Sequence, residues 1–84
     1  MILKDAMNTY NPALELILKK GFQINIIDYE ESFDWKASND KVELIASDPL
    51  RLLALIHIHE MKGEEWNEYD ENYYDKILKD FYGE

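Results

Sequence analysis

Two helix start signals constrain the fold more than any other feature of this sequence. Asn11-Pro12 and Asp48-Pro49 each place a good N-cap residue before a proline. Proline loses nothing at the first helical position, because the N–H group there has no partner within the helix. Gly21 and Gly63 follow as residues that readily adopt the left-handed conformation in which helices end. These signals predict helices over residues 13–20 and 50–62.

Between the two helices the apolar residues recur at every second position, which is the period of a half-buried strand. There are three such runs: Phe22-Ile24-Ile26, Phe33-Trp35-Ala37 and Val42-Leu44-Ala46. Polar residues at 30–32 and 38–41 separate them, and Asn39-Asp40 is able to form a tight hairpin with positive φ. The short turns predict an antiparallel meander of three strands.

A helical period returns in the last quarter of the chain. Tyr69, Tyr73, Ile77 and Phe81 recur at every fourth position. We expect Asn67 or Asp70 as the N-cap of this last helix, with the neighbouring acids in its first turn, where the helix dipole favours anions. The predicted order is α-β-β-β-α-α, an α+β fold with residues 1–84 in one compact domain. The helix over 50–62 is apolar nearly all round and is therefore expected at the centre.

Length, charge and composition exclude several classes of function. The 84 residues contain no cysteine, which rules out disulfides, thiolate nucleophiles and cysteine zinc sites. A chain this short forms a thin core with little room for an enclosed active site. A net charge of −9 repels nucleic-acid phosphates and anionic lipid, so we expect no direct nucleic-acid or membrane partner.

The apolar runs are also too short for a membrane span, which needs about 20 residues. The first residues, Met1 to Asp5, lack the basic and apolar regions of a signal peptide. Together with the absence of cysteine, this predicts a cytoplasmic protein.

The histidines are the first candidates for catalysis or metal binding. His57 and His59 are two residues apart on the predicted helix and therefore point about 200° apart. Glu60 shares a face with His57, but two ligands are too few for a metal site. No glycine-rich loop, nucleophile elbow or calcium loop is present. We therefore expect no metal, no cofactor and no enzymatic activity.

The C-terminal quarter carries the most informative pattern. Residues 64–84 have eight acidic and two basic groups, a net of −6. Carboxylates alternate there with aromatic side chains, which are common at the energetic centre of protein interfaces. The candidate partner-binding residues are Trp66, Tyr69, Asp70, Glu71, Tyr73, Tyr74 and Asp75. Two interpretations fit: a surface for a basic protein partner, or a helix that buries its aromatic stripe and exposes its acids to solvent.

One protein family has a similar tail. In its length, its predicted element order and the stretch from Trp66 to Asp75, the chain resembles small phage-encoded type II anti-CRISPR proteins, which inhibit Cas9. The resemblance implies an α-β-β-β-α-α fold. It also implies an acidic surface that mimics DNA and occupies the basic site that reads the PAM.

The resemblance assigns particular residues to that surface. Tyr69, Asp70 and Glu71 match the tyrosine and acids that enter the basic groove. Asn39 and Asp40 match an acidic hairpin turn, although Lys41 adds a positive charge here.

These observations lead to two functional hypotheses, beside a third, a small enzyme or metal protein using His57, His59 and Glu60, that we do not expect. The first is a non-catalytic acidic protein-binding domain that inhibits a basic nucleic-acid-binding protein by mimicking nucleic acid. The second is a structural or oligomeric module, a homodimer formed through the apolar helix over residues 50–61.

Overall fold

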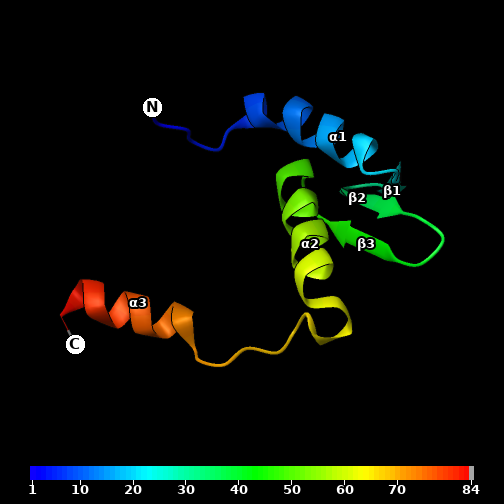
Figure 1. Cartoon of the computed structure of the whole chain (residues 1–84). Coiled ribbons are helices and arrows are strands. Elements are labelled where there is room, and N and C mark those ends of the chain that lie inside the picture. The colour runs from blue at the N-terminus through cyan, green and yellow to red at the C-terminus, as the bar shows by residue number, and fades with distance from the viewer. Residues whose placement is uncertain (84) are drawn as a thin grey trace.

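The computed structural model describes residues 1–83 and has the predicted order α-β-β-β-α-α (Figure 1). Two helices lie on one face of a three-stranded sheet, and the third helix stands apart from both. The elements are η1 (Met7–Thr9), α1 (Tyr10–Lys19), β1 (Gln23–Asp28), β2 (Phe33–Ser38), β3 (Glu43–Ala46), α2 (Pro49–Lys62), η2 (Gly63–Glu65) and α3 (Tyr73–Tyr82), where η denotes a 3-10 helix.

The sheet confirms the predicted antiparallel meander. Its strand order is β1-β2-β3, and β2 pairs with both neighbours. The register aligns Ile24 with Ala37 and Leu44 across the three strands. Because side chains alternate between the faces of a strand, this alignment puts one apolar row toward the helices.

The two hairpin turns differ from the sequence-based expectation. Asn39 and Asp40 do not have positive φ; instead the Asn39 Oδ1 accepts hydrogen bonds from the N–H groups of Lys41 and Val42, at 2.8 and 3.0 Å. Such an Asx turn closes the hairpin without left-handed backbone. The positive φ occurs in the other hairpin, at Glu30, where φ is 78°.

The core lies between the sheet and the two packed helices. Its buried members are Ile17, Phe22, Ala37, Leu52 and Ile56, and α2 packs against α1, β2 and β3. The predicted central position of this helix is therefore confirmed only for the side of α2 that packs against α1, β2 and β3. On its other side Ile58 and Met61 are exposed, because no element covers them.

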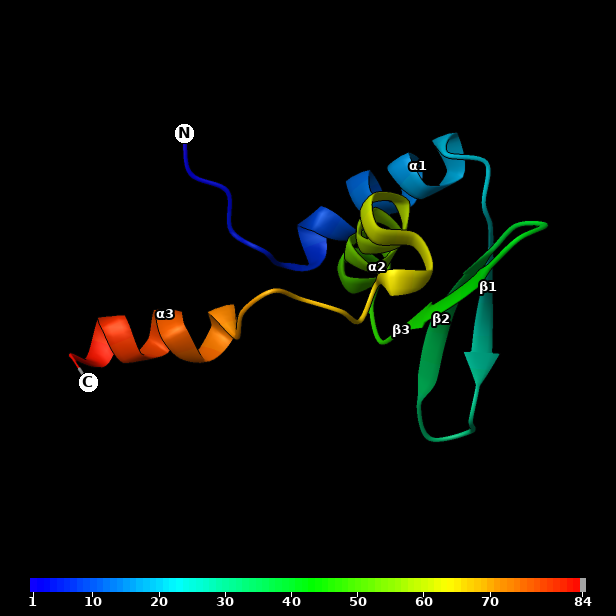
Figure 2. The same ribbon diagram turned by 60° about the horizontal axis from the view of Figure 1, so that its bottom comes forward.

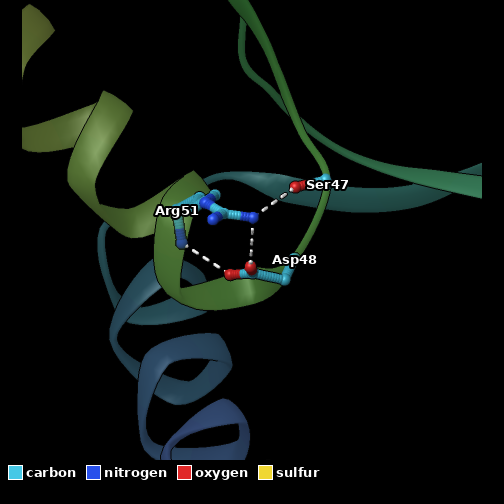
Figure 3. A network of polar contacts seen from close by, with 3 residues as sticks. All are labelled: Ser47, Asp48 and Arg51. Carbon is cyan, nitrogen blue, oxygen red and sulfur yellow. Dashed lines mark hydrogen bonds and ion pairs between the residues drawn. The ribbon is translucent and has the colours of Figure 1, made fainter. Parts of the chain in front are cut away.

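The predicted start of α2 is confirmed in detail (Figure 3). The Asp48 Oδ1 accepts a hydrogen bond from the Arg51 N–H at 2.8 Å, and Pro49 is the first helical residue. The Arg51 guanidinium then donates to the Asp48 carboxylate and to the Ser47 hydroxyl, at 3.3 and 3.0 Å. Gly63, with φ of 63°, follows the last residue of the helix as predicted.

Helix α1 begins earlier than predicted, at Tyr10. Asn11 is therefore not its N-cap, and Pro12 is the third helical residue. This position tolerates proline because the first four N–H groups of a helix have no partner within it. The 3-10 turn η1 leads into the helix and shifts its start.

Helix α3 begins later than predicted. Its N-cap is Asn72, not Asn67 or Asp70, so Glu68, Asp70 and Glu71 lie before the helix instead of in its first turn. Every residue of α3 is exposed.

The overall dimensions reflect this separated helix. The radius of gyration is 15.4 Å, whereas a compact chain of this length has about 12 Å. The accessible surface is 7360 Å², against about 5200 Å² for a compact monomer of 10.0 kDa. The chain therefore exposes about 2000 Å² more surface than a compact fold of its size.

Candidate protein-binding surface

The candidate residues of the C-terminal quarter lie in an extended linker and in the first turn of α3. Trp66 to Asn72 connect η2 to the helix, and all of them are exposed. Between Lys62 and Lys76 the chain has six carboxylates and no lysine or arginine. We call residues 64–82, from the end of η2 to the end of α3, the acidic arm.

A cap fixes the junction between linker and helix. The Asn72 Oδ1 accepts a hydrogen bond from the Asp75 N–H at 3.2 Å, and the Asn72 Nδ2 donates to the Asp75 carboxylate at 2.9 Å. The Glu71 carboxylate forms an ion pair with Lys76 at 3.1 Å. At the other end of the linker, the Lys62 ammonium donates to the Glu68 carbonyl. These contacts are local to the arm and the end of α2.

The helix itself is split into an apolar and a charged half. At 100° per residue, six side chains fall within one half of its circumference. These six are 39–79% exposed: Tyr73, Tyr74, Ile77, Leu78, Phe81 and Tyr82. The opposite half has two acids, Asp75 and Asp80, and two bases, Lys76 and Lys79. The apolar half is the face that a helix normally buries, and here it is open.

The expectation that the last helix buries its aromatic stripe is wrong. Tyr69 lies in the linker and is 69% exposed, so it does not continue the helical series. Tyr73, Ile77 and Phe81 share a helix face, but the core does not cover them. The stripe is an exposed surface of the monomer.

The hairpin residues do not join this surface. Asn39 and Asp40 lie at the turn between β2 and β3, which points to the opposite side of the molecule from α3 (Figures 1 and 2). Gly21 and Gln23 share a shallow hollow with them. A single contact surface that includes both the arm and this turn would need a partner that wraps around the body.

The arm has open hollows of its own. One open hollow lies between the end of α2 and the linker; its lining includes Met61, Glu65, Tyr69 and Asp70, together with Lys62, whose ammonium donates to the Glu68 carbonyl. Another lies around Tyr73 and Tyr74. The second hollow has a carboxylate beside aromatic rings and no basic residue in its lining, an arrangement suited to a guanidinium or ammonium group from a partner.

His57 is exposed and His59 half-buried on α2. Over residues 1–83, no three metal-ligating side chains come together. In the same range no helix combines the length and apolarity needed to cross a bilayer.

Sequence reasoning overlooked part of the exposed surface. Ile77, Leu78, Phe81 and Tyr82 were not among the candidate partner-binding residues, because an amphipathic stripe normally indicates a buried helix face. The signal was present in the linker: six acids without a base keep residues 64–75 hydrated.

Comparison of the chain with protein-family models, with curated proteins and with solved structures found no match.

Proposed function

We propose that this chain is a non-catalytic protein-binding module whose acidic segment, residues 64–75, binds a basic protein surface. One observation carries the proposal: the carboxylates and aromatic side chains of residues 64–75 are exposed together, with no basic residue among them. Carboxylates accept bidentate hydrogen bonds from arginine, and adjacent aromatic rings supply apolar contact. The arrangement places a run of negative charges beside aromatic rings, as a nucleic-acid strand places phosphates beside bases.

The specific form of the proposal is inhibition by nucleic-acid mimicry. A basic groove that normally holds phosphates would take the linker, with Asp70 and Glu71 in place of phosphates and Tyr69 in place of a stacked base. The resemblance of the tail to Cas9-inhibiting anti-CRISPR proteins supports this form. The hairpin turn at Asn39 and Asp40 is not needed for it, because this turn points away from the arm.

The test is capture of a partner from cell lysate by the tagged full-length chain at low and high salt. We expect the wild type to capture a basic nucleic-acid-binding protein at low salt and to lose it as salt screens the charges. The variant Tyr69→Ala/Asp70→Lys/Glu71→Lys should lose it at every salt concentration.

Two matched variants separate local charge from net charge. Asp70→Asn/Glu71→Gln and Glu30→Gln/Glu31→Gln remove the same number of negative charges, the first in the arm and the second in the β1–β2 turn. Only the arm variant should lose the partner. Equal loss in both variants, or binding that is constant from low to high salt, would contradict the proposal.

A further inference from the structure

A second apolar surface lies at the other end of α2. The N-terminal segment leads into α1, and α1 lies beside the start of α2 (Figure 1). Residues of these three segments line an open groove. Ile2 and Leu3 on its rim are 86% and 83% exposed, and Leu16 is 48% exposed. Leu50 and Leu53 are half-buried in its wall. The groove is mainly apolar and shows the surface properties of a helix-binding site.

The chain's own α3 does not occupy this groove. No residue after Leu53 lines it, and the extended linker leads α3 away from the body (Figure 2). The seven linker residues, 66–72, reach at most about 23–25 Å. This reach allows α3 to meet a neighbouring molecule.

Helix α3 needs another surface to bury its apolar face, because the helix is short. It has ten residues, and isolated helices shorter than about 12–15 residues are marginal in water. Four of its six apolar side chains are aromatic, and such side chains bury about 150–250 Å² each when covered. With the fractions already exposed, covering this face removes on the order of 600 Å² from water. This is close to the roughly 800 Å² that each partner contributes to a standard interface.

Charge indicates what kind of surface covers the helix. The whole chain carries −9, but α3 is neutral, with two acids and two bases. A helix adapted to a basic groove would be expected to be acidic, as the linker is. A neutral helix is one that can approach another copy of this acidic chain without repulsion.

We propose that α3 of one molecule docks in the groove of a second copy, and that the exchange is reciprocal. Each copy then contributes one helix and one groove, which is the closed arrangement of a two-fold dimer. One helix face of about 600 Å² and a groove of similar area together bury about 1200 Å² per chain, which is more than half of the excess surface of about 2000 Å². The contact differs from the dimer predicted through residues 50–61, because it uses only the first turns of α2.

The inference does not depend on the proposed function. Docking buries Ile77, Leu78 and Phe81, whereas the linker carboxylates remain outside the groove. Variants of Asp70 and Glu71 therefore test the basic partner, and variants of Ile77 and Phe81 test the dimer. The experiments can therefore contradict the basic partner and support the dimer, or the reverse.

The first experiment is sedimentation equilibrium of the full-length chain from about 1 to 500 μM. We expect a mass twice the 10.0 kDa of the chain at high concentration. Ile77→Asp/Phe81→Asp should weaken association at least 100-fold, and this variant keeps its fold because neither side chain is buried. Lys76→Ala/Lys79→Ala changes the net charge by the same −2 on the opposite face and should still dimerise.

The second experiment mixes two variants that are each monomeric. Leu3→Asp/Leu16→Asp damages the groove at two exposed positions and keeps α3 intact, whereas Ile77→Asp/Phe81→Asp does the reverse. Reciprocal exchange predicts that neither associates alone and that the mixture forms a heterodimer, since one helix–groove contact is complete.

Three outcomes would overturn the inference. A wild type that stays at the mass of one chain at 500 μM excludes the dimer, and α3 amides protected in that monomer would place the helix on its own body. A mixture that remains monomeric excludes the helix–groove contact. A dimer that survives both double variants uses another surface.

Discussion

Helices α2 and α3 are built from the same local elements but differ in what surrounds them. Each is capped by an Asp or Asn side chain, has an apolar face and ends at a glycine with positive φ. Helix α2 buries Leu52 and Ile56 completely between α1 and the sheet, whereas α3 buries nothing. Local sequence thus specifies a helix in both places, but only α2 has an apolar surface next to it in the same molecule.

The difference between the two helices should be largest in native-state hydrogen exchange. In dilute solution, where any dimer is dissociated, we expect α3 amides to exchange within about tenfold of the unstructured rate, because no packing opposes their opening. Amides in the middle of α2 should be slowed by more than about 10³-fold. Equal protection in both helices would show that α3 packs on the body in solution.

Truncation of one side chain in each helix should separate them by several kcal/mol. Leu52→Ala leaves a cavity in the core and should lower the free energy of unfolding by about 2–5 kcal/mol. Phe81→Ala should change it by less than about 0.5 kcal/mol in dilute solution, because the ring is 79% exposed. Urea denaturation followed by circular dichroism measures the free energy of unfolding of both variants. A large effect of Phe81→Ala would show that the Phe81 ring is packed in the folded chain, as Leu52 is.

The two caps offer a finer comparison. Asp48→Ala removes the hydrogen bond to the Arg51 N–H and should cost about 1 kcal/mol of global stability. Asn72→Ala should lower the helical content of α3 and leave the unfolding midpoint of the body unchanged, since α3 is not part of the core. Asp48→Asn serves as the control and should retain most of the stability, because asparagine is an equally good cap.

The smallest expected effect lies within the body, at the β1–β2 turn. Glu30 has a φ of 78°, which is unfavourable for a residue with a Cβ atom. Glu30→Gly should therefore raise the free energy of unfolding by about 0.5–1 kcal/mol. Glu31→Gly is the control: Glu31 has no positive φ, so glycine there should destabilise the fold. A loss of stability in both variants would mean that the side chain of Glu30 outweighs its backbone strain.

The fold could be predicted to the extent that it depends on short-range chemistry. The alternation of apolar and polar residues over positions 22–46 predicted the three strands. Because side chains in a strand point to alternate faces, the apolar residues of each run must share the face toward the core. The cap at Asp48 and the stop at Gly63 were equally clear. The errors were also local. Asn72 caps α3 through its hydrogen bonds with Asp75, so the helix begins later than predicted. In the β2–β3 turn the Asn39 side chain accepts a backbone hydrogen bond, and the turn closes without positive φ.

The candidate site was predictable as a stretch of sequence but not as a surface. Trp66 to Asp75 were identified by their interleaved acids and aromatics, and all of them are exposed. The sequence placed Asn39 and Asp40 with them only through the family resemblance, and the structure sets that turn on the opposite side. Ile77, Leu78, Phe81 and Tyr82 extend the exposed surface beyond the predicted residues.

By itself, the sequence determined the secondary structure, the strand order and the acidic character of the arm. These depend on residues within a few positions of one another, through sterics, capping and charge. Only the tertiary structure decided which apolar faces are covered. Covering a face requires a complementary surface within reach. The core lies between α1, α2 and the sheet, and the linker leads α3 away from it. The apolar face of α3 therefore remains open, and we propose that a second copy covers it.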